Sequence, residues 1–338
     1  MLKKVLFGLI ITIFCLVFLS LEAAWGCSLM MKSNKQGIFV GRTTEWWGPL
    51  KTRIALIPRG FKDHDRFGSL NWTNKYGVIA IEDDEKFGYS GEGINEQGLN
   101  VHLLYQDDSR MPEPQPGLPE ISTVAWTKYI LATYGSVKEV VTGLKNYRIK
   151  MVDFPYQGKK VKVPCHFAVN DASGDAAVIE FNGGKMQVFH GPQYNVMTNE
   201  PNYPRQLANL AQFKKEKKQY SVEDLPGGAK PSNRFVRISF NLDNLPQPKD
   251  PVEAVAYMEQ VIDSVLVPAY DDKKHPFSPQ SDSWAARWRV VYDLSRMNMY
   301  FDQEETGKSI YLKIKDLDFT GSEIKYLKLS DYKSAYEL

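Results

Sequence analysis

Segments with a strand pattern occur in clusters along this chain, and helical patterns separate the clusters. Short runs rich in Val, Ile, Leu and Phe between polar turns indicate strands, whereas apolar residues at three- to four-residue spacing indicate helices. The first cluster contains five predicted strands, at residues 28–32, 37–42, 53–58, 76–81 and 99–105. A loop at 107–119 with four prolines then leads to a predicted helical hairpin at 122–133 and 137–144.

The second half of the chain shows the same separation. Four strands are predicted at 166–170, 176–181, 186–190 and 195–198, followed by three helices at 203–217, 233–242 and 251–265. The last strands are predicted at 287–293, 299–301 and 310–314. Helices kept apart from antiparallel strands fit this order better than an alternating parallel fold. The predicted fold class is therefore α+β: a four-layer αββα sandwich, with two antiparallel sheets face to face and helices on the outer faces.

The N-terminal segment has the pattern of a secretory signal peptide. Lys3 and Lys4 precede an apolar run over residues 5–19, and the small residues Ala24 and Gly26 stand before Cys27 at the spacing that signal peptidase prefers. The run spans about 15 residues, fewer than the roughly 20 that a membrane-spanning helix needs. We therefore expect residues 1–26 to be a signal peptide, 27–338 to form the mature domain without a membrane span, and the protein to be periplasmic or secreted.

Three other interpretations of this segment stay open: a retained membrane anchor, a core helix, and a lipoprotein signal that acylates Cys27. The lipoprotein signal requires a Leu-like residue three positions before the cysteine, where this chain has Ala24. Acylation would block the α-amine of Cys27.

Charge argues against a nucleic-acid partner. Removal of residues 1–26 takes away Lys3, Lys4 and Glu22, so the formal net charge falls from +2 to +1. No basic excess then remains to attract a phosphate backbone. The composition leaves open whether the protein is a homo-oligomer.

The cysteines leave two alternatives. Cys15 lies in the predicted signal peptide, so the mature chain keeps Cys27 and Cys165. In an oxidising compartment these two would form a disulfide. Alternatively, Cys27 is free, since it stands at the predicted cleavage point and one bridge adds little to a chain of this size.

A free N-terminal cysteine would combine two chemical functions. Its thiol is a nucleophile, its own α-amine is a base, and both groups titrate close to neutral pH. Arg42, at the end of the second predicted strand, can return to Cys27 across a hairpin and favour the thiolate. Glu45 follows three residues later and can orient the amine or the thiol. By spacing alone, a surface ion pair would be the better interpretation of Arg42 and Glu45.

Five sequence blocks follow one another from the predicted cleavage site. They are Cys27 with Gly41-Arg42-Thr43-Thr44-Glu45-Trp46, then 92–99 leading to Leu104-Tyr105, then 166–169 with 171–174 and 179–181, then 196–201, and 225–228 with 233–237. In this order they resemble the choloylglycine hydrolase family, which contains bile salt hydrolases and penicillin V acylases. The resemblance covers nearly all of the mature chain and implies an N-terminal-nucleophile hydrolase fold.

The resemblance also implies roles for individual residues. Cys27 would be the nucleophile and Arg42 the cation beside it. Glu45 stands where the family has an aspartate, and its extra methylene means that the orienting hydrogen bond has to be rebuilt.

Three more residues match positions of the family pattern. Asn199 and the backbone N–H of Tyr105 would form the oxyanion hole, and Arg234 would hold the charge network. Without the resemblance, Asn199 would be interpreted as a turn residue, Tyr105 as a packing residue at a strand end, and Arg234 as a surface charge.

The implied reaction is hydrolysis of a linear amide through a thioester, with no metal or organic cofactor. The five histidines show no metal-binding spacing. The expected substrate is a small molecule with a bulky apolar acyl group: a conjugated bile salt, penicillin V or an N-acyl homoserine lactone. Trp46, Trp47, Phe87 and Tyr89 are placed on loops, where they would line an acyl pocket or pack in the core.

Two rivals remain. One is a catalytically impaired or lipidated binding protein on the same fold, and the other is the acid ceramidase group, which usually cleaves its chain internally. Here the cysteine directly follows the signal, so internal cleavage is not needed. A Ser-x-x-Lys match at 330–333 lies in a polar tail without the helix that its chemistry requires, and we interpret it as chance.

Overall fold

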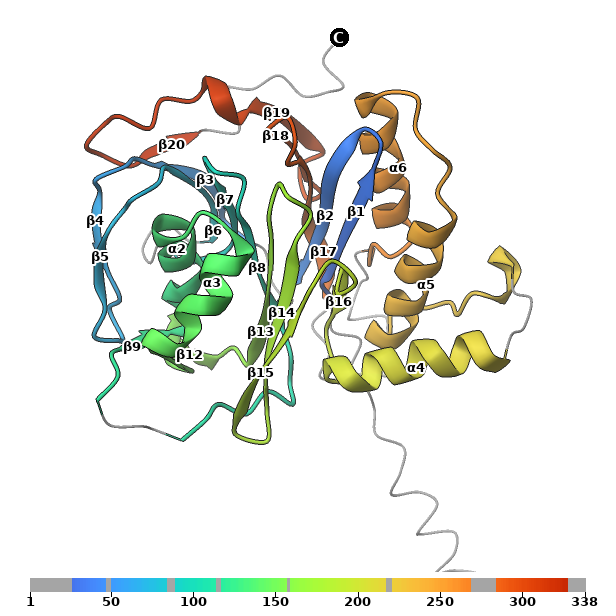
Figure 1. Ribbon diagram of the computed structural model, residues 1–338, viewed down its shortest axis with the longest axis horizontal. Helices are drawn as coiled ribbons and strands as arrows, with labels where there is room; N and C mark the ends of the chain where they lie inside the picture. The colour runs from blue at the N-terminus through green and yellow to red at the C-terminus, as the bar shows by residue number, and fades with distance from the viewer. Residues whose placement is uncertain are drawn as a thin grey trace, which may run out of the picture.

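Two antiparallel sheets form the centre of the molecule (Figure 1). The computed structural model describes residues 26–46, 50–83, 89–113, 117–156, 159–216, 221–268 and 284–327. The six-stranded sheet has the order β16 (Val196–Thr198), β1 (Ser28–Asn34), β2 (Gly37–Trp46), β17 (Ala285–Asp293), β18 (Asn298–Gln303) and β19 (Lys308–Lys313). The eight-stranded sheet has the order β15 (Lys185–His190), β14 (Ala176–Asn182), β13 (Cys165–Asn170), β8 (Asn100–Tyr105), β7 (Tyr89–Asn95), β6 (Val78–Asp83), β3 (Thr52–Ile57) and β20 (Lys325–Leu327).

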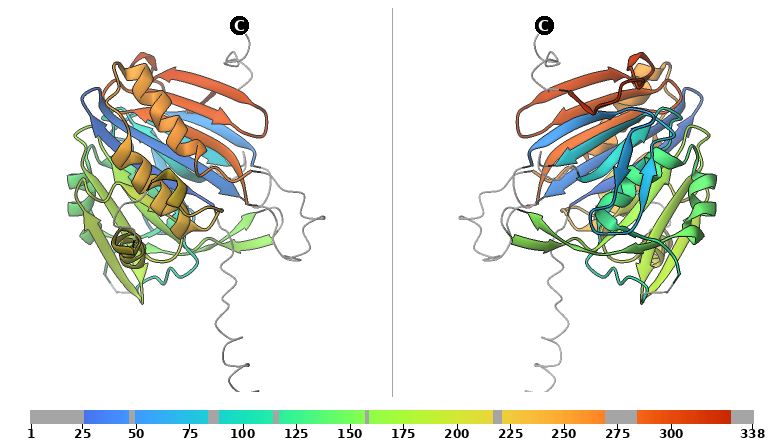
Figure 2. Two further views of the ribbon diagram at one scale, coloured as in Figure 1. Left: turned by 90° about the vertical axis from the view of Figure 1, so that its right-hand side faces the viewer. Right: turned by 90° about the vertical axis from the view of Figure 1, so that its left-hand side faces the viewer.

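Helices cover the outer faces of both sheets. The two outer layers are α2 (Thr123–Thr133) with α3 (Val137–Gly143) against the eight-stranded sheet, and α5 (Pro231–Asn244) with α6 (Pro251–Asp263) against the six-stranded sheet. Figure 2 shows each pair of helices lying across its sheet. α4 (Tyr203–Glu216) packs beside α5. The predicted four-layer αββα sandwich is confirmed.

Short elements complete the chain. They are the strand pairs β4 (Lys62–His64) with β5 (Asn71–Thr73), β9 (Glu120–Ser122) with β10 (Arg148–Lys150), and β11 (Asp153–Tyr156) with β12 (Lys159–Lys162), and the 3₁₀ turns η1 (Leu144–Asn146), η2 (Val222–Asp224) and η4 (Ile314–Asp316). Within the described ranges, no helix is long and apolar enough to cross a membrane.

The two faces of the eight-stranded sheet bury different sets of residues. Val101 and Phe167 face α2 and α3, whereas Leu104 and Ala168 belong to the core that extends to the six-stranded sheet. Successive side chains of a strand point to opposite faces, so this alternation follows from the strand geometry. It also places His102 and His166 on the inner face, between the sheets.

All twelve predicted strands and all five predicted helices are present, with shifts of a few residues at their ends. The prediction missed β7, a central strand whose Ser-Gly-Glu-Gly composition has low strand propensity. Gly93 is required there because a Cβ atom would lie 2.5 Å from the Ile79 carbonyl oxygen and 2.7 Å from Leu131. The formation of β7 therefore depends on its packing against β6 and α2 and not on the propensity of its own residues.

Two loop assignments were wrong. Trp46 is the last residue of β2 and Tyr89 is the first residue of β7, because pairing with β17 and β6 extends both strands beyond the apolar pattern. Trp47, Phe87, the segment 330–333 and the predicted signal peptide up to residue 25 lie outside the described residues.

Candidate active site

Cys27 lies immediately before β1, at the point where three chain segments meet. β1 pairs with β2 on one side and with β16 on the other, and Ser28 is opposite both Thr43 and Thr198. This register brings the Arg42–Glu45 segment and Asn199 to either side of Cys27. The cysteine is 5% exposed, and its Sγ lies 3.9 Å from the Glu45 carbonyl oxygen.

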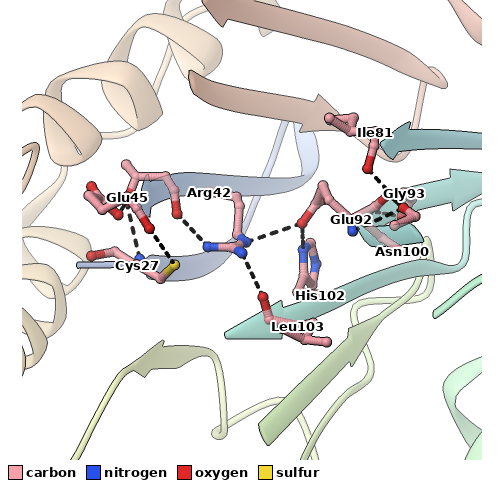
Figure 3. Close-up of polar contacts among 12 residues, drawn as sticks. Cys27, Arg42, Glu45, Ile81, Glu92, Gly93, Asn100, His102 and Leu103 are labelled. Atoms are coloured by element: carbon pink, nitrogen blue, oxygen red, sulfur yellow. Dashed lines mark hydrogen bonds and ion pairs between the residues drawn. The ribbon is translucent and has the colours of Figure 1, made fainter. Parts of the chain in front are cut away.

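Arg42 reaches from the six-stranded sheet to the eight-stranded sheet (Figure 3). Its Nε donates to Glu92 Oε2 at 3.2 Å, its Nη2 donates to the Leu103 carbonyl at 2.7 Å, and its Nη1 donates to the Thr43 carbonyl. Burial lowers the pKa of Arg42, but the charges of Cys27 and Glu92 outweigh burial and raise it overall. Arg42 is therefore a buried cation next to the thiol.

Glu45 is also buried, and its side chain lies against Gly26. Its Oε2 accepts a hydrogen bond from Thr43 Oγ1 at 3.0 Å, while its buried Oε1 accepts none from the described residues. Burial raises the pKa of the Glu45 carboxyl, an effect that Arg234 opposes. The surface ion pair between Arg42 and Glu45 is ruled out, because both side chains are buried and Arg42 pairs with Glu92 instead.

Arg234 ties Cys27 to Asn199. From the first turn of α5, its Nη1 donates to the Cys27 carbonyl and to Ser28 Oγ, both at 2.6 Å, and its Nη2 donates to Asn199 Oδ1 at 2.8 Å. Burial lowers the pKa of this guanidinium, and the charges of Glu45 and Cys27 oppose that effect. Arg234 is fully buried and so is not a surface charge.

The amide of Asn199 has a fixed orientation. Its Nδ2 donates to the Tyr105 carbonyl at 2.8 Å, while Arg234 holds its Oδ1. The segment is anchored from behind, since Gln206 Nε2 donates to the carbonyls of Asn199 and Glu200, and the Tyr203 N–H donates to Glu180. One N–H of the Asn199 amide is engaged by Tyr105, and the second can donate to another acceptor.

The backbone of Tyr105 faces the same site. The backbone N–H of Gln106 donates to the carbonyl of Pro164, the residue before β13, and Tyr105 is opposite Cys165 in the adjoining register. Backbone N–H and C=O groups alternate in direction along an antiparallel strand. Those of Tyr105 therefore point away from β13, toward Asn199, as the oxyanion assignment requires.

Three aromatic side chains form a cluster that includes Tyr105. Trp284 contacts Trp46 at a ring-centroid distance of 5.2 Å and Tyr105 at 5.5 Å. All three side chains are partly exposed. Trp46 and Tyr105 pack against the core under α2 and α3. Of the three residues, the sequence pattern had named only Trp46 as a pocket or core aromatic.

The comparisons with known proteins agree with this geometry. The family model of the linear amide C–N hydrolases, choloylglycine hydrolase family, matches residues 27–326. The chain belongs to the choloylglycine hydrolase family. It is therefore a hydrolase of linear amide C–N bonds.

Relatives within the choloylglycine hydrolase family include acylases and bile salt hydrolases. A penicillin V acylase of Pectobacterium atrosepticum is 29% identical over 294 residues, covering 82% of this chain and 77% of the relative. A bile salt hydrolase/transferase of Clostridium perfringens is 26% identical over 332 residues, covering 89% and 96%. The solved penicillin V acylase from Agrobacterium tumefaciens superposes with a TM-score of 0.75 at 29% identity, covering 89% of this chain and 91% of that one.

The structure resolves the disulfide alternative. Cys27 and Cys165 are both free thiols, and they belong to different cores, Cys27 to the core between the sheets and Cys165 to the core under α2 and α3. Because the eight-stranded sheet carries Cys165 on its outer face, a bridge to Cys27 would have to pass through the sheet.

The two thiols should differ in reactivity. Burial raises the pKa of Cys165 far above its ordinary value, opposed only weakly by a hydrogen bond to Thr123, so this thiol stays protonated at pH 8. We expect iodoacetamide to add one equivalent to the native mature protein, at Cys27, and two equivalents after denaturation. Intact mass and peptide mapping measure this directly, and native labelling at Cys165 would contradict it.

Three residues near the site, of which Glu92 and His102 are buried, were not foreseen as participants. Glu92 and His102 form a cross-strand pair behind Arg42. Glu200, next to Asn199, has both carboxyl oxygens buried, and burial raises its pKa to about 7. Glu92 and Glu200 both lie inside sequence blocks that resemble the family. If β7 had been predicted as a strand, the alternation of its side chains would have placed Glu92 on the inner face of the sheet. Within the described ranges, no group of three or more His, Cys, Asp or Glu side chains is arranged to hold a metal ion.

Proposed function

We propose that this hydrolase is an exported amidase in which removal of residues 1–26 makes Cys27 the N-terminal nucleophile. The observation that carries this proposal is the double anchoring by Arg234, which holds the carbonyl of Cys27 and the amide of Asn199 together. One buried side chain thus sets the distance between nucleophile and oxyanion donor. Such fixed geometry is what acyl transfer requires.

The junction before Cys27 supports the proposal. Gly26 is buried against Glu45, and a Cβ atom at residue 26 would lie 2.3 Å from Glu45 Cβ. Removal of Gly26 leaves room for the new α-ammonium next to the buried Glu45 carboxyl. The longer glutamate can in this way replace the aspartate of the family pattern.

The proposed reaction begins with transfer of the thiol proton to the α-amine of Cys27. Sγ bonds to the substrate carbonyl carbon, and the resulting oxyanion accepts hydrogen bonds from Asn199 Nδ2 and the Tyr105 N–H. The C–N bond then breaks and the leaving amine takes the proton from the α-ammonium. A water molecule loses a proton to the α-amine, attacks the thioester, and releases the carboxylic acid and the thiol.

The proposed substrate carries a bulky apolar acyl group. The aromatic cluster of Trp46, Tyr105 and Trp284 begins one residue after Glu45, and the relatives include a penicillin V acylase and a bile salt hydrolase/transferase. We infer that penicillin V, a conjugated bile salt or an N-acyl homoserine lactone is cleaved. A panel of these three amides with released amine as the readout tests the inference, and an acetyl amide serves as the small-acyl control.

Cleavage at the predicted site is tested by exporting the full chain from a secreting bacterium. We expect an intact mass that begins at unmodified Cys27 under non-reducing conditions. A lipidated or uncut chain would instead favour the binding-protein alternative, because in neither does Cys27 have a free α-amine.

The free amine itself can be tested with two forms of the mature protein. One begins at Cys27 and the other keeps Gly26 as a single extra residue. Because an amide nitrogen is not a base, we expect the extended form to lose about 10²- to 10⁴-fold in kcat, the range of general-base catalysis. A glycine added at the C-terminus is the matched control, and equal activity of the two N-terminal forms would refute the assigned base.

A further inference from the structure

Arg42 is held by a carboxylate that does not touch the reacting atoms. Glu92 lies on β7 and is completely buried, and its Oε2 accepts from Arg42 Nε at 3.2 Å. Arg42 lies between Glu92 and Cys27 (Figure 3). The carboxylate therefore acts on the thiol only through the guanidinium.

His102 fixes Glu92 from the other side. The two residues are directly opposite on β7 and β8, and His102 Nδ1 lies 2.8 Å from the same Oε2. His102 Nε2 is buried and has no hydrogen-bond partner in the part of the chain described. A proton on Nε2 would have no acceptor among the described residues, so we place a proton on Nδ1, where it is donated to Glu92.

Burial of the Arg42–Glu92 ion pair costs desolvation free energy. A role in positioning Arg42 would explain why the pair is present. A buried ion pair is often no more stable than apolar residues of the same volume, and here the surroundings are the apolar core between two sheets. The pair does, however, join strands from different sheets, β2 and β7. The ion pair therefore fixes the position of the Arg42 guanidinium relative to Cys27, which directly precedes β1 of the six-stranded sheet.

We propose that Glu92 and His102 are positioning residues for the reaction at Cys27, holding Arg42 at the thiol and balancing its charge. The proposal rests on the proposed function of Cys27 as nucleophile. Other charged or titratable groups also face this centre and stay in place in the variants below: Glu45 from β2, Arg234 from α5, Tyr292 from β17 and Glu200 after β16.

Glu92→Gln removes the charge and keeps the shape. We expect kcat to fall about 10- to 100-fold, the effect of a small misplacement at the reacting centre, with KM nearly unchanged because Glu92 does not touch substrate. Since Arg42 is then no longer balanced, the thiolate is favoured. The acid limb of the kcat/KM profile should therefore move to lower pH.

Glu82→Gln is the matched control. Glu82 is 1% exposed, lies on the adjacent strand β6 of the same sheet, and accepts hydrogen bonds from Arg53 at 3.0 and 2.9 Å. It makes the same kind of ion pair but has no contact with Arg42. This variant should lose some stability and keep the wild-type pH profile and kcat.

The histidine provides a rescue test. His102→Asn can still donate from its amide to Glu92, whereas His102→Leu has a similar size and no donor. We expect the kcat of the asparagine variant to lie nearer the wild type. A purely structural role would instead make the two variants follow their melting temperatures.

The pH dependence of Cys27 alkylation by iodoacetamide gives a readout that needs no substrate. With Glu92→Gln its midpoint should shift to lower pH, and with Glu82→Gln it should not. Unshifted alkylation and unshifted kinetics in folded Glu92→Gln would overturn the positioning role. Failure of wild-type protein to hydrolyse any amide would count against the proposed function alone, because alkylation still measures how Arg42 acts on Cys27.

Discussion

Cys27→Ala should abolish amide hydrolysis while leaving the fold intact. The substitution removes the sulfur that forms the thioester, and loss of the nucleophile in a hydrolase costs on the order of 10⁶-fold in kcat. The side chain is small and its thiol donates only to the distant Glu45 carbonyl, so the packing changes little. Turnover of the best substrate from the amide panel measures the effect.

Cys27→Ser separates nucleophilicity from geometry. A hydroxyl fits the same space but ionises far less readily than a thiol, so we expect a large loss here too. A thermal melt of each variant within a few degrees of the wild type is the control for folding. Substantial hydrolysis by folded Cys27→Ala would show that another residue performs the chemistry.

Asn199→Leu should lower kcat about 10²- to 10³-fold, the usual cost of one oxyanion-hole donor. Leucine has a similar volume but cannot donate to the oxyanion. It also removes the hydrogen bonds that Asn199 makes with Arg234 Nη2 and with the Tyr105 carbonyl, at roughly 1–3 kcal/mol for each. Kinetics at saturating substrate measure the first effect, and urea unfolding measures the second.

Asn195→Leu is the control for Asn199. Asn195 precedes β16 and donates from Nδ2 to the Met31 carbonyl at 3.0 Å, so its loss also disturbs the junction of β16 and β1. Its amide does not contact Tyr105 or Arg234. We expect reduced stability with kcat within a few-fold of the wild type. An Asn199→Leu variant with raised KM and unchanged kcat would mean that Asn199 binds substrate and transition state equally.

The wrong and missed assignments have a common physical cause. β7 contains Gly93, which its close packing against β6 and α2 demands, and its two glycines weaken the strand pattern. Trp46 was assigned to a loop because β2 extends past its apolar residues by pairing with β17, a strand about 240 residues later in the chain. In both elements a distant partner supplies the stabilisation that local propensity lacks.

In the candidate site, too, some residues are brought together by local structure and others only by contacts between distant segments. Cys27, Arg42 and Glu45 are within 18 residues of one another, and one hairpin suffices to bring them together. Tyr105, Asn199 and Arg234 were identified through their place in family blocks, since nothing local distinguishes a buried Arg234 from a surface charge at a helix start.

The sequence by itself determined the fold class, the likeness to one family and the residue types of the site, because period-two and helical patterns and short motifs are local properties of the chain. Only the tertiary structure decided which partners those residues have. In the folded protein a sheet lies between Cys165 and Cys27. Arg42 forms its ion pair with Glu92 instead of Glu45, and His102 contacts Glu92 from the other side. Burial and charge pairing depend on contacts between strands far apart in the chain, which no local pattern encodes.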